Sequence, residues 1–206
     1  MGIPLKKIDN KGFTLLELMV TLAIAAILAT VALPSFTSSI RNNRLTTTNN
    51  EFLASLNLAR SEAIKRGVSV TVRKVDNNSF TNFSAGANWE DGWDIFTDAD
   101  GDGDFEAGDI PIRTNQALPA SYTLRGNNTF DDFVSFTTTG LSNNAGNFTL
   151  CDSSDGNTIP EADTSRLILV NTVGRPRTGV DPNNDGIPNT DNVASTASNI
   201  TNCTPT

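Results

Sequence analysis

The chain has 206 residues, with 15 lysines and arginines against 23 aspartates and glutamates, so its formal charge is −8 and its isoelectric point is about 4.4. This length suits one domain with an appendage, and the acidity excludes a protein that coats nucleic acid over its whole surface. The sequence contains no histidine, which removes the usual general base and the commonest ligand of catalytic zinc. Because it also lacks a paired nucleophile and base and a phosphate-binding lysine loop, we predict that the protein is not an enzyme.

A long apolar run begins near the N-terminus and extends from Phe13 to Leu33. As a helix it is about 30 Å long, which is enough to cross a bilayer, and a helix of a soluble core is the alternative. Lys6, Lys7 and Lys11 precede the run, and the positive-inside rule then places the N-terminus in the cytoplasm. We therefore predict a transmembrane segment over residues 13–34.

The helix is expected to continue beyond the apolar run in an amphipathic form. Pro34 ends the run, so we expect a kink or break there, followed by resumed helix over residues 35–66. Gly67 is the natural stop of this helix. Its apolar stripe, which we expect to face a core, consists of Leu45, Phe52, Leu56, Ala59 and Ala63.

After Gly67 the hydrophobic period changes from 3.6 to 2, beginning with Val68, Val70 and Val72. Short segments of this kind alternate with Gly, Asn, Asp and Pro clusters, which indicates antiparallel β structure over residues 67–206. The predicted fold class is therefore α+β, with a long N-terminal helix packed on a head of antiparallel sheets. The expected strands cover residues 68–75, 92–97, 110–114, 121–125, 133–137, 147–151 and 166–172.

The sequence KGFTLLELMVTLAIAAILATVALP places Gly12 before the apolar run and Glu17 inside it, whereas an ordinary secretory signal has its cleavage site after the apolar region. This arrangement resembles the signal of type IV pilins and type II secretion pseudopilins. The resemblance implies that residues 1–12 are a leader, that a prepilin peptidase cuts between Gly12 and Phe13, and that the new amine is methylated. It also implies that Glu17 faces the N-terminal amine of an adjacent subunit during assembly. The alternative is an incidental carboxylate that reaches the membrane interface.

Two further segments, EFLASLNLARSEAIKRGVSVTV and GWDIFTDADGDGDFEAGDIPIR, are similar to the GspH/FimT family of minor pilins and minor pseudopilins. This resemblance implies a type IV pilin-like fold, an inner-membrane anchor with a periplasmic head, and other major and minor pilins as partners. Our first hypothesis is a minor pilin that joins a type IV pilus or primes its assembly. Because pilus and secretion systems share this leader and helix, a minor pseudopilin of a type II secretion system is the alternative.

Residues 98–109 read DADGDGDFEAGD and match the spacing of an EF-hand calcium loop, with Gly103 at the position of the sharp turn. The last position is an aspartate and not the longer bidentate glutamate of that motif, so a solvated acidic turn is the alternative. Apart from this calcium ion we predict no cofactor. The candidate ligands are Asp98, Asp100, Asp102, Asp104 and Asp109.

Gly174-Arg175-Pro176-Arg177 follows the last expected strand. In an extended segment alternate residues point the same way, so the two arginines form a fork that suits phosphates. A GRxR motif near the C-terminus is a feature of FimT-type minor pilins that bind DNA in natural transformation, and the resemblance implies contact with double-stranded DNA. The alternative is a turn that solubilises a hairpin or contacts a neighbouring pilin. The cations expected to join Arg175 and Arg177 are Lys65, Arg66, Arg73 and Lys74.

Cys151 and Cys203 are the only cysteines. Outside the cytoplasm an even pair is more often a disulfide than a reactive site, and the absence of a CxxC motif leaves a redox centre without support. We predict a disulfide that pins the C-terminal segment. Within that segment the second acidic run, residues 181–192, is a weaker match to a calcium loop, and we expect a flexible polar tail there.

Overall fold

The structure is a computed structural model of the chain. It describes residues 12–75, 86–127, 129–154, 156, 158–189 and 199–203, without the side chains of 31–35. Most of the predicted leader, residues 1–11, therefore lies outside the described residues. The chain divides into two compact units, residues 1–40 and 41–206, and we call the second unit the head.

One α-helix, one short 3₁₀ helix and eight strands make up the regular structure of the described residues, and the predicted α+β class is confirmed. Every expected strand is present, and the sequence reasoning missed only the short strand β8 and the 3₁₀ turn η1. The elements are α1 (Leu15–Arg66), β1 (Val70–Lys74), η1 (Trp89–Asp91), β2 (Trp93–Thr97), β3 (Pro111–Asn115), β4 (Tyr122–Gly126), β5 (Phe133–Phe136), β6 (Gly146–Asp152), β7 (Ser165–Val170) and β8 (Pro176–Thr178).

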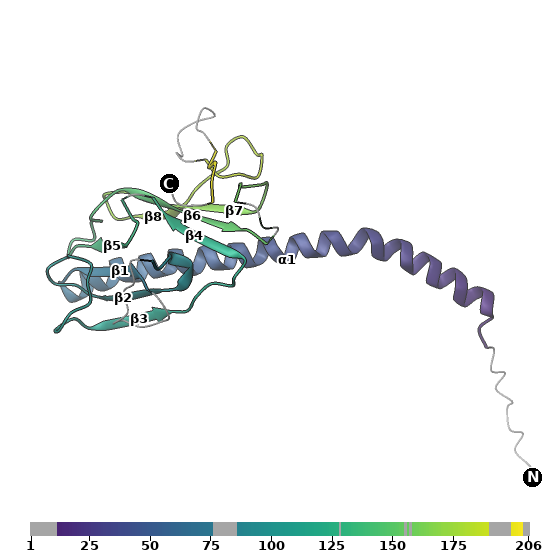
Figure 1. Cartoon of the computed structure of the whole chain (residues 1–206), viewed down its shortest axis with the longest axis horizontal. Coiled ribbons are helices and arrows are strands. Elements are labelled where there is room, and N and C mark those ends of the chain that lie inside the picture. The colour runs from purple at the N-terminus through teal and green to yellow at the C-terminus, as the bar shows by residue number, and fades with distance from the viewer. Residues whose placement is uncertain are drawn as a thin grey trace, which may run out of the picture. The chain divides into compact units, whose positions relative to one another are not determined.

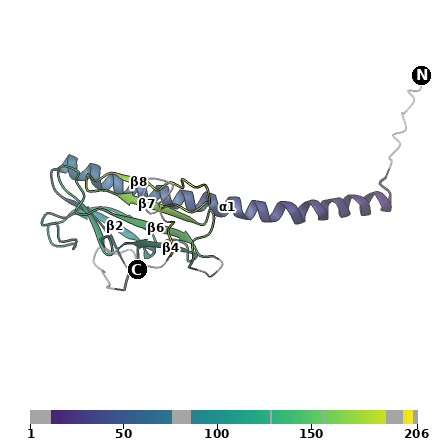
Figure 2. The same cartoon turned by 90° about the horizontal axis from the view of Figure 1, so that it is seen from above.

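The strands form two antiparallel sheets, with the orders β3-β2-β1-β5 and β4-β6-β7-β8. In Figure 1 the second sheet lies on one side of the C-terminal part of α1, while β2 and β3 lie on the other side. Figure 2 shows the same head from above, with β7 and β8 along the helix. Strand β1 is central in the first sheet, and β8 is an edge strand of the second.

The core of the head is shared by α1 and both sheets. The predicted stripe on the helix is confirmed, since all five of its apolar side chains are fully buried. Phe52 is at the centre, with its ring edge-on to Trp89, Trp93 and Phe148 at centroid distances of 5.6, 5.0 and 4.7 Å. Such edge-to-face packing adds to the burial of apolar area, and it fixes the helix between the sheets.

α1 is continuous from Leu15 to Arg66, so the break considered at Pro34 is absent from the backbone. Gly67 ends the helix at φ +68°, as predicted, and its N–H donates to the carbonyl of Ala63 at 3.0 Å. Residues 13–34 were expected to form a transmembrane segment. Within the described part of the chain, no helix has the combination of length and hydropathy that a membrane span requires.

In the expected polar tail, residues 181–189 have a defined path with hydrogen bonds, while 190–192 lie outside the described residues; the flexibility of the tail stays a prediction. The carboxylate of Asp181 accepts the N–H of Gly186 at 2.7 Å, and the N–H of Asp163 donates to the Gly186 carbonyl at 2.9 Å. Asn189 is only 1% exposed and forms an antiparallel bridge with Asn199. The composition is polar, but backbone and Asx hydrogen bonds order this loop.

Candidate functional site

The start of α1 is organised by Thr14 and Glu17. The N–H of Glu17 donates to the Thr14 hydroxyl at 3.2 Å, and the Glu17 carboxylate accepts the N–H of Thr14, also at 3.2 Å. This reciprocal pair is a capping box, which the spacing T-x-x-E signals in the sequence and which our reasoning there missed. Gly12 and Phe13, the predicted cleavage pair, precede the helix, and Phe13 is 90% exposed.

The GRPR segment forms the turn into β8. Gly174 has φ +73°, and a Cβ there would lie 2.0 Å from the carbonyl oxygen of Gly140, so only glycine fits. Arg175 and Arg177 are exposed, and neither side chain makes an ion pair or a hydrogen bond within the described residues. Arg177 lies opposite Leu169 of β7. The structure thus presents Arg177 to solvent from an edge strand and Arg175 from the turn that precedes it.

Two of the cations expected to join them are instead buried in the first sheet. Arg73 is 7% exposed, donates to the carbonyl of Gly103 at 2.7 Å and pairs with Asp104. Lys74 is 5% exposed and pairs with Asp131 and Asp132 at 3.4 and 3.0 Å. The prediction of Arg73 and Lys74 as part of a cationic surface is therefore wrong, because β1 is a central strand and its cations neutralise neighbouring loops.

Lys65 and Arg66 lie in the last turn of α1, where both pair with Glu62. Arg66 Nε is 2.6 Å and Lys65 Nζ 3.2 Å from the Glu62 carboxylate. The hydrogen bond from Arg66, and next that from Lys65, holds the pKa of Glu62 below its ordinary value. The Lys65 side chain is nevertheless 73% exposed. These two cations stay accessible, but their charge is partly offset within the helix.

The acidic loop, residues 98–110, is closed by Asp98. The Asp98 carboxylate is fully buried and accepts hydrogen bonds from the hydroxyl of Thr71 at 2.6 Å and from the N–H groups of Gly101 and Gly103 at 2.7 and 3.0 Å. Burial raises the pKa of Asp98, and these three donors oppose that effect. Asp98 is therefore an anchor between β1 and the loop.

The five candidate calcium ligands separate into two groups. Carboxylate oxygens of Asp98, Asp100 and Asp102 all lie within 4.8 Å of one another. Asp104 instead pairs with Arg73, and Asp109 accepts the N–H of Glu106 at 2.9 Å. The described loop thus gathers three of the five acids named from the sequence, and calcium binding stays a prediction.

The same loop covers the outer face of the first sheet. The ring of Phe105 packs edge-on against Phe96, with centroids 5.3 Å apart, and Gly103 lies against the ring of Phe133. Phe96 is only 1% exposed although it points away from the helix. The loop is therefore a packed cover of the sheet, with Asp98 buried beneath it and with Asp100, Asp102, Asp104 and Glu106 exposed to solvent.

A cavity of about 590 Å³ lies between this loop and the end of α1. Asp100, Glu106 and Asp109 supply its carboxylates, and we call it the acidic pocket. Repulsion from Asp102 and then Asp100 is the main cause that raises the pKa of Glu106. Sequence reasoning missed this pocket, because it forms only when the loop folds back toward the helix. Its other lining residues are Arg66, Val68, Thr97, Ala99, Ala107, Gly108 and Ile110.

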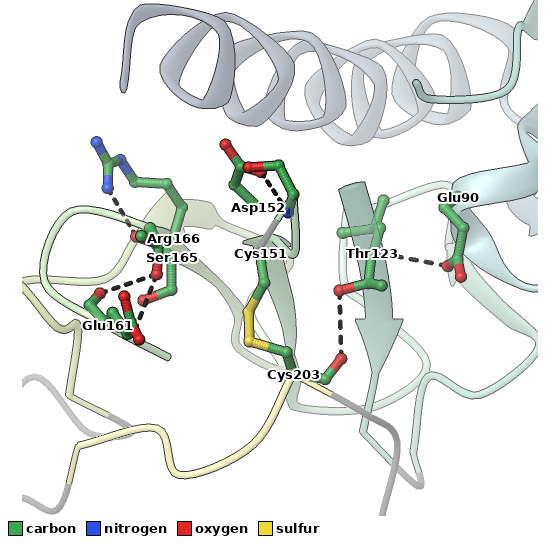
Figure 3. The surroundings of a disulfide bond; sticks show 11 residues. Glu90, Thr123, Cys151, Asp152, Glu161, Ser165, Arg166 and Cys203 are labelled. Carbon is green, nitrogen blue, oxygen red and sulfur yellow. Dashed lines mark hydrogen bonds between the residues drawn. A yellow bond between two sulfur atoms is a disulfide. The ribbon is translucent and has the colours of Figure 1, made fainter. Parts of the chain in front are cut away.

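The predicted disulfide between Cys151 and Cys203 is confirmed, with the two Cα atoms 5.9 Å apart. It joins β6 to the C-terminal segment, as Figure 3 shows. The hydroxyl of Thr123 on β4 donates to the Cys203 carbonyl at 3.3 Å, and the Cys203 N–H donates to Thr158 at 2.9 Å. The bond and these contacts fix Cys203 against the second sheet.

Comparison with known families gives two matches along the chain. Residues 8–33 match the prokaryotic N-terminal methylation motif, and residues 48–174 match the model of the type II transport protein GspH. The two regions cover the start of α1 and most of the head. No curated protein matches the chain.

Solved structures with a similar fold include two pilin-like proteins. The type IV minor pilin FimU of Pseudomonas aeruginosa is 20% identical, with a TM-score of 0.50, and the match covers 68% of this chain and 90% of that chain. The minor pseudopilin EpsH of the Vibrio cholerae type 2 secretion system is 12% identical, with a TM-score of 0.45 and coverage of 68% and 98%. The likeness to FimU supports the fold.

The GspH match includes the end of α1, every strand as far as β7 and the turn before β8, and it extends over more than half of the sequence. Together with the methylation motif at the start of α1, this match shows the family. The chain belongs to the GspH family of pilin-like proteins, the structural subunits known as minor type IV pilins and minor pseudopilins.

Proposed function

We propose that the protein is a minor subunit of a type IV pilus, incorporated in the filament or priming its assembly. The observation that carries this proposal is the combination, in one chain, of the N-terminal methylation motif and a GspH head. A prepilin peptidase would cut between Gly12 and Phe13, which leaves Phe13 as the methylated N-terminus. In the filament, Glu17 would then contact the N-terminal amine of the adjacent subunit.

The proposal includes an inner-membrane precursor with a periplasmic head. Its support is the methylation motif at residues 8–33 and the disulfide between Cys151 and Cys203, since disulfides persist in oxidising compartments. A disulfide that closes a loop of this length stabilises the native state by about 4 kcal/mol. This stabilisation would be lost in a reducing cytoplasm.

A minor pseudopilin of a type II secretion system is the alternative, and the name of the matched family model supports it. We favour the pilus because the GRPR segment of FimT-type pilins is present, with Arg175 exposed in the turn before β8 and Arg177 exposed on β8. Membership of the family implies association with other pilin-like subunits in either system.

Processing and incorporation test the proposal directly. The full chain, expressed with its own prepilin peptidase, should lose residues 1–12 and gain one methyl group on Phe13, as read by mass spectrometry. Gly12→Leu should block both changes, while Gly2→Leu serves as the matched control. The mature protein should then be found in sheared pili. Its absence from pili, together with a loss of protein secretion in a deletion strain, would instead favour the secretion system.

Contact with double-stranded DNA is a second candidate, favoured by the exposure of Arg175 and Arg177. Two phosphate contacts give a salt slope of only about −1.8, so binding would be weak and strongest at low salt. The double variant Arg175→Ala, Arg177→Ala should abolish it, whereas Arg41→Ala, Arg44→Ala should not. Unchanged affinity of the GRPR variant for a DNA duplex at low salt would exclude this candidate.

A further inference from the structure

An exposed apolar surface adjoins the two exposed arginines of the GRPR segment. Ile64 near the end of α1, Leu141 in the loop after β5 and Val173 in the turn before β8 are 51%, 47% and 53% exposed. Single exposed apolar side chains are common, but several that adjoin one another and are bordered by charged residues are typical of an interaction site. The arginine patch, as we call this surface, consists of Ile64, Leu141, Val173, Arg175 and Arg177.

Contacts between the three segments hold the arginine patch together. The carbonyl of Gly140 accepts a hydrogen bond from Arg60 Nε at 3.0 Å, and a Cβ on Gly140 would lie 2.8 Å from Ile64 Cδ1. Gly174 packs directly on Gly140, and the N–H of Ser142 donates to the carbonyl of Thr172 at 3.2 Å. The patch is therefore a fixed part of the head and not a set of unrelated loops.

The acidic pocket lies on the opposite side of the helix end. Ile64 contacts Gly140 in the patch, whereas Arg66 lines the pocket. Two residues along an α-helix correspond to a rotation of about 200°, so these neighbours point in nearly opposite directions. Figure 1 agrees, because β8 lies above α1 and β3, which follows the acidic loop, lies below it.

The two surfaces are complementary in charge and in polarity. The pocket offers the carboxylates of Asp100, Glu106 and Asp109 beside apolar walls that include Val68 and Ile110. An arginine has an apolar stem and a guanidinium group that binds carboxylates in a bidentate manner, so it matches both parts of such a pocket. Ile110 is itself 52% exposed and provides an apolar contact for the patch.

We infer that the arginine patch of one chain docks on the acidic pocket of a second copy, with Arg175 and Arg177 in the pocket and Val173 near Ile110. A patch and a pocket on opposite sides of one subunit form a head-to-tail contact, which leaves both outer surfaces free for further copies. Nucleic acid fits less well, because a phosphate backbone offers no apolar surface to Ile64, Leu141 and Val173. This inference rests on the proposed subunit role for its biological setting.

Cysteine cross-linking of the full chain in detergent micelles tests the contact. Val173→Cys and Ile110→Cys are made as separate variants, purified and oxidised alone or mixed. The mixture should give a cross-linked dimer, and each variant alone should give little, because the proposed contact pairs unlike positions. Retention of the Cys151–Cys203 bond is checked by mass spectrometry. Efficient cross-linking of Val173→Cys with itself would indicate a twofold contact and overturn the inference.

Charge exchange provides a second measurement that does not depend on oxidation. Arg175→Glu with Arg177→Glu, or Asp100→Lys with Glu106→Lys, should each weaken self-association about tenfold or more. A mixture of the two double variants should recover it, since each substituted surface then meets one of opposite charge. The matched control, Arg41→Glu with Arg44→Glu, changes the net charge equally at exposed positions outside the patch and should leave association unchanged.

The outcomes separate this inference from the proposed function. A full chain that stays monomeric at all concentrations and is nevertheless recovered from pili overturns the inference alone. Failure of recovery in the mixture also overturns it. If the arginine variant loses affinity for a DNA duplex while the full chain shows no self-association, the arginines belong to a nucleic-acid contact and the inference is wrong. Circular dichroism of every variant verifies the fold.

Discussion

Asp94 in the middle of β2 makes the stability of the head depend on pH. Its carboxylate is fully buried, and neither oxygen accepts a hydrogen bond of normal geometry within the described residues. Burial raises the pKa of Asp94 from its ordinary value of 3.8 to about 6, and the nearby Thr114 side chain offsets only part of this. The cross-strand neighbour Arg73 directs its guanidinium to Gly103 and Asp104.

The direction of the effect follows from proton linkage. Because the pKa is higher in the folded chain, the native state holds its proton more tightly than the unfolded state does. Stability from this group is therefore fully present below pH 3.8 and is lost as the pH rises to about 6. One pKa unit corresponds to 1.36 kcal/mol, so the loss is about 3 kcal/mol.

Asp94→Asn keeps the shape of the protonated acid and removes the charge. At pH 7 we expect the variant head, residues 41–206, to be about 3 kcal/mol more stable than the unsubstituted head, and at pH 4 the two should be about equal. Urea unfolding between pH 4 and 8 measures both differences, and Glu51→Gln is the control for an exposed carboxylate. The reasoning is refuted if the difference in the free energy of unfolding between the Asp94 variant and the unsubstituted head does not change with pH. It is also refuted if the variant is the less stable of the two at pH 7.

Three further predictions concern stability. Cys151→Ser with Cys203→Ser should lower the free energy of unfolding by about 4 kcal/mol in non-reducing urea titrations, and an equal loss on adding reductant to the unsubstituted chain is the check. Gly174→Ala should lower the stability measured by thermal unfolding by about 1 to 3 kcal/mol or more, because the added Cβ meets the carbonyl of Gly140. Gly108→Ala is the control, since the space around it is open and only the backbone strain of φ +117° remains. Arg73→Met should cost about 1.5 to 3 kcal/mol and raise hydrogen exchange across residues 98–110, and unchanged exchange would contradict its role as a tether.

The regular elements were predictable because their signals are local. The apolar stripe of α1 and the alternation at Val70 and Val72 reflect burial against a core that is continuous along each element. Gly67 marks the helix end through its own backbone preference. By contrast β8 contains a proline and has only three residues, so its pairing with β7 is set by tertiary contact and not by its composition.

The distribution of charge was not predictable in the same way. Arg73 and Lys74 follow Lys65 and Arg66 closely in sequence, which suggested one cationic surface. In the fold, β1 has neighbouring strands on both sides and the acidic loop on its outer face, so both cations are buried with acidic partners. The available signal was the paired composition, since the cations of a central strand can be neutralised by acidic residues in the loops beside it, here Asp104 for Arg73 and Asp131 with Asp132 for Lys74.

The fold therefore divides the charged residues by role. The central strand uses Arg73 and Lys74 to bind acidic residues of neighbouring loops, whereas the side chains of Arg175 and Arg177, at the start of an edge strand, have no partner among the described residues. The carboxylates of the acidic pocket are likewise crowded, as the raised pKa of Glu106 indicates. Charged surfaces that have no partner of opposite charge within the fold gain most from binding a surface of opposite charge. The sign of the total charge of the chain therefore says little about what binds to the arginine patch or to the acidic pocket.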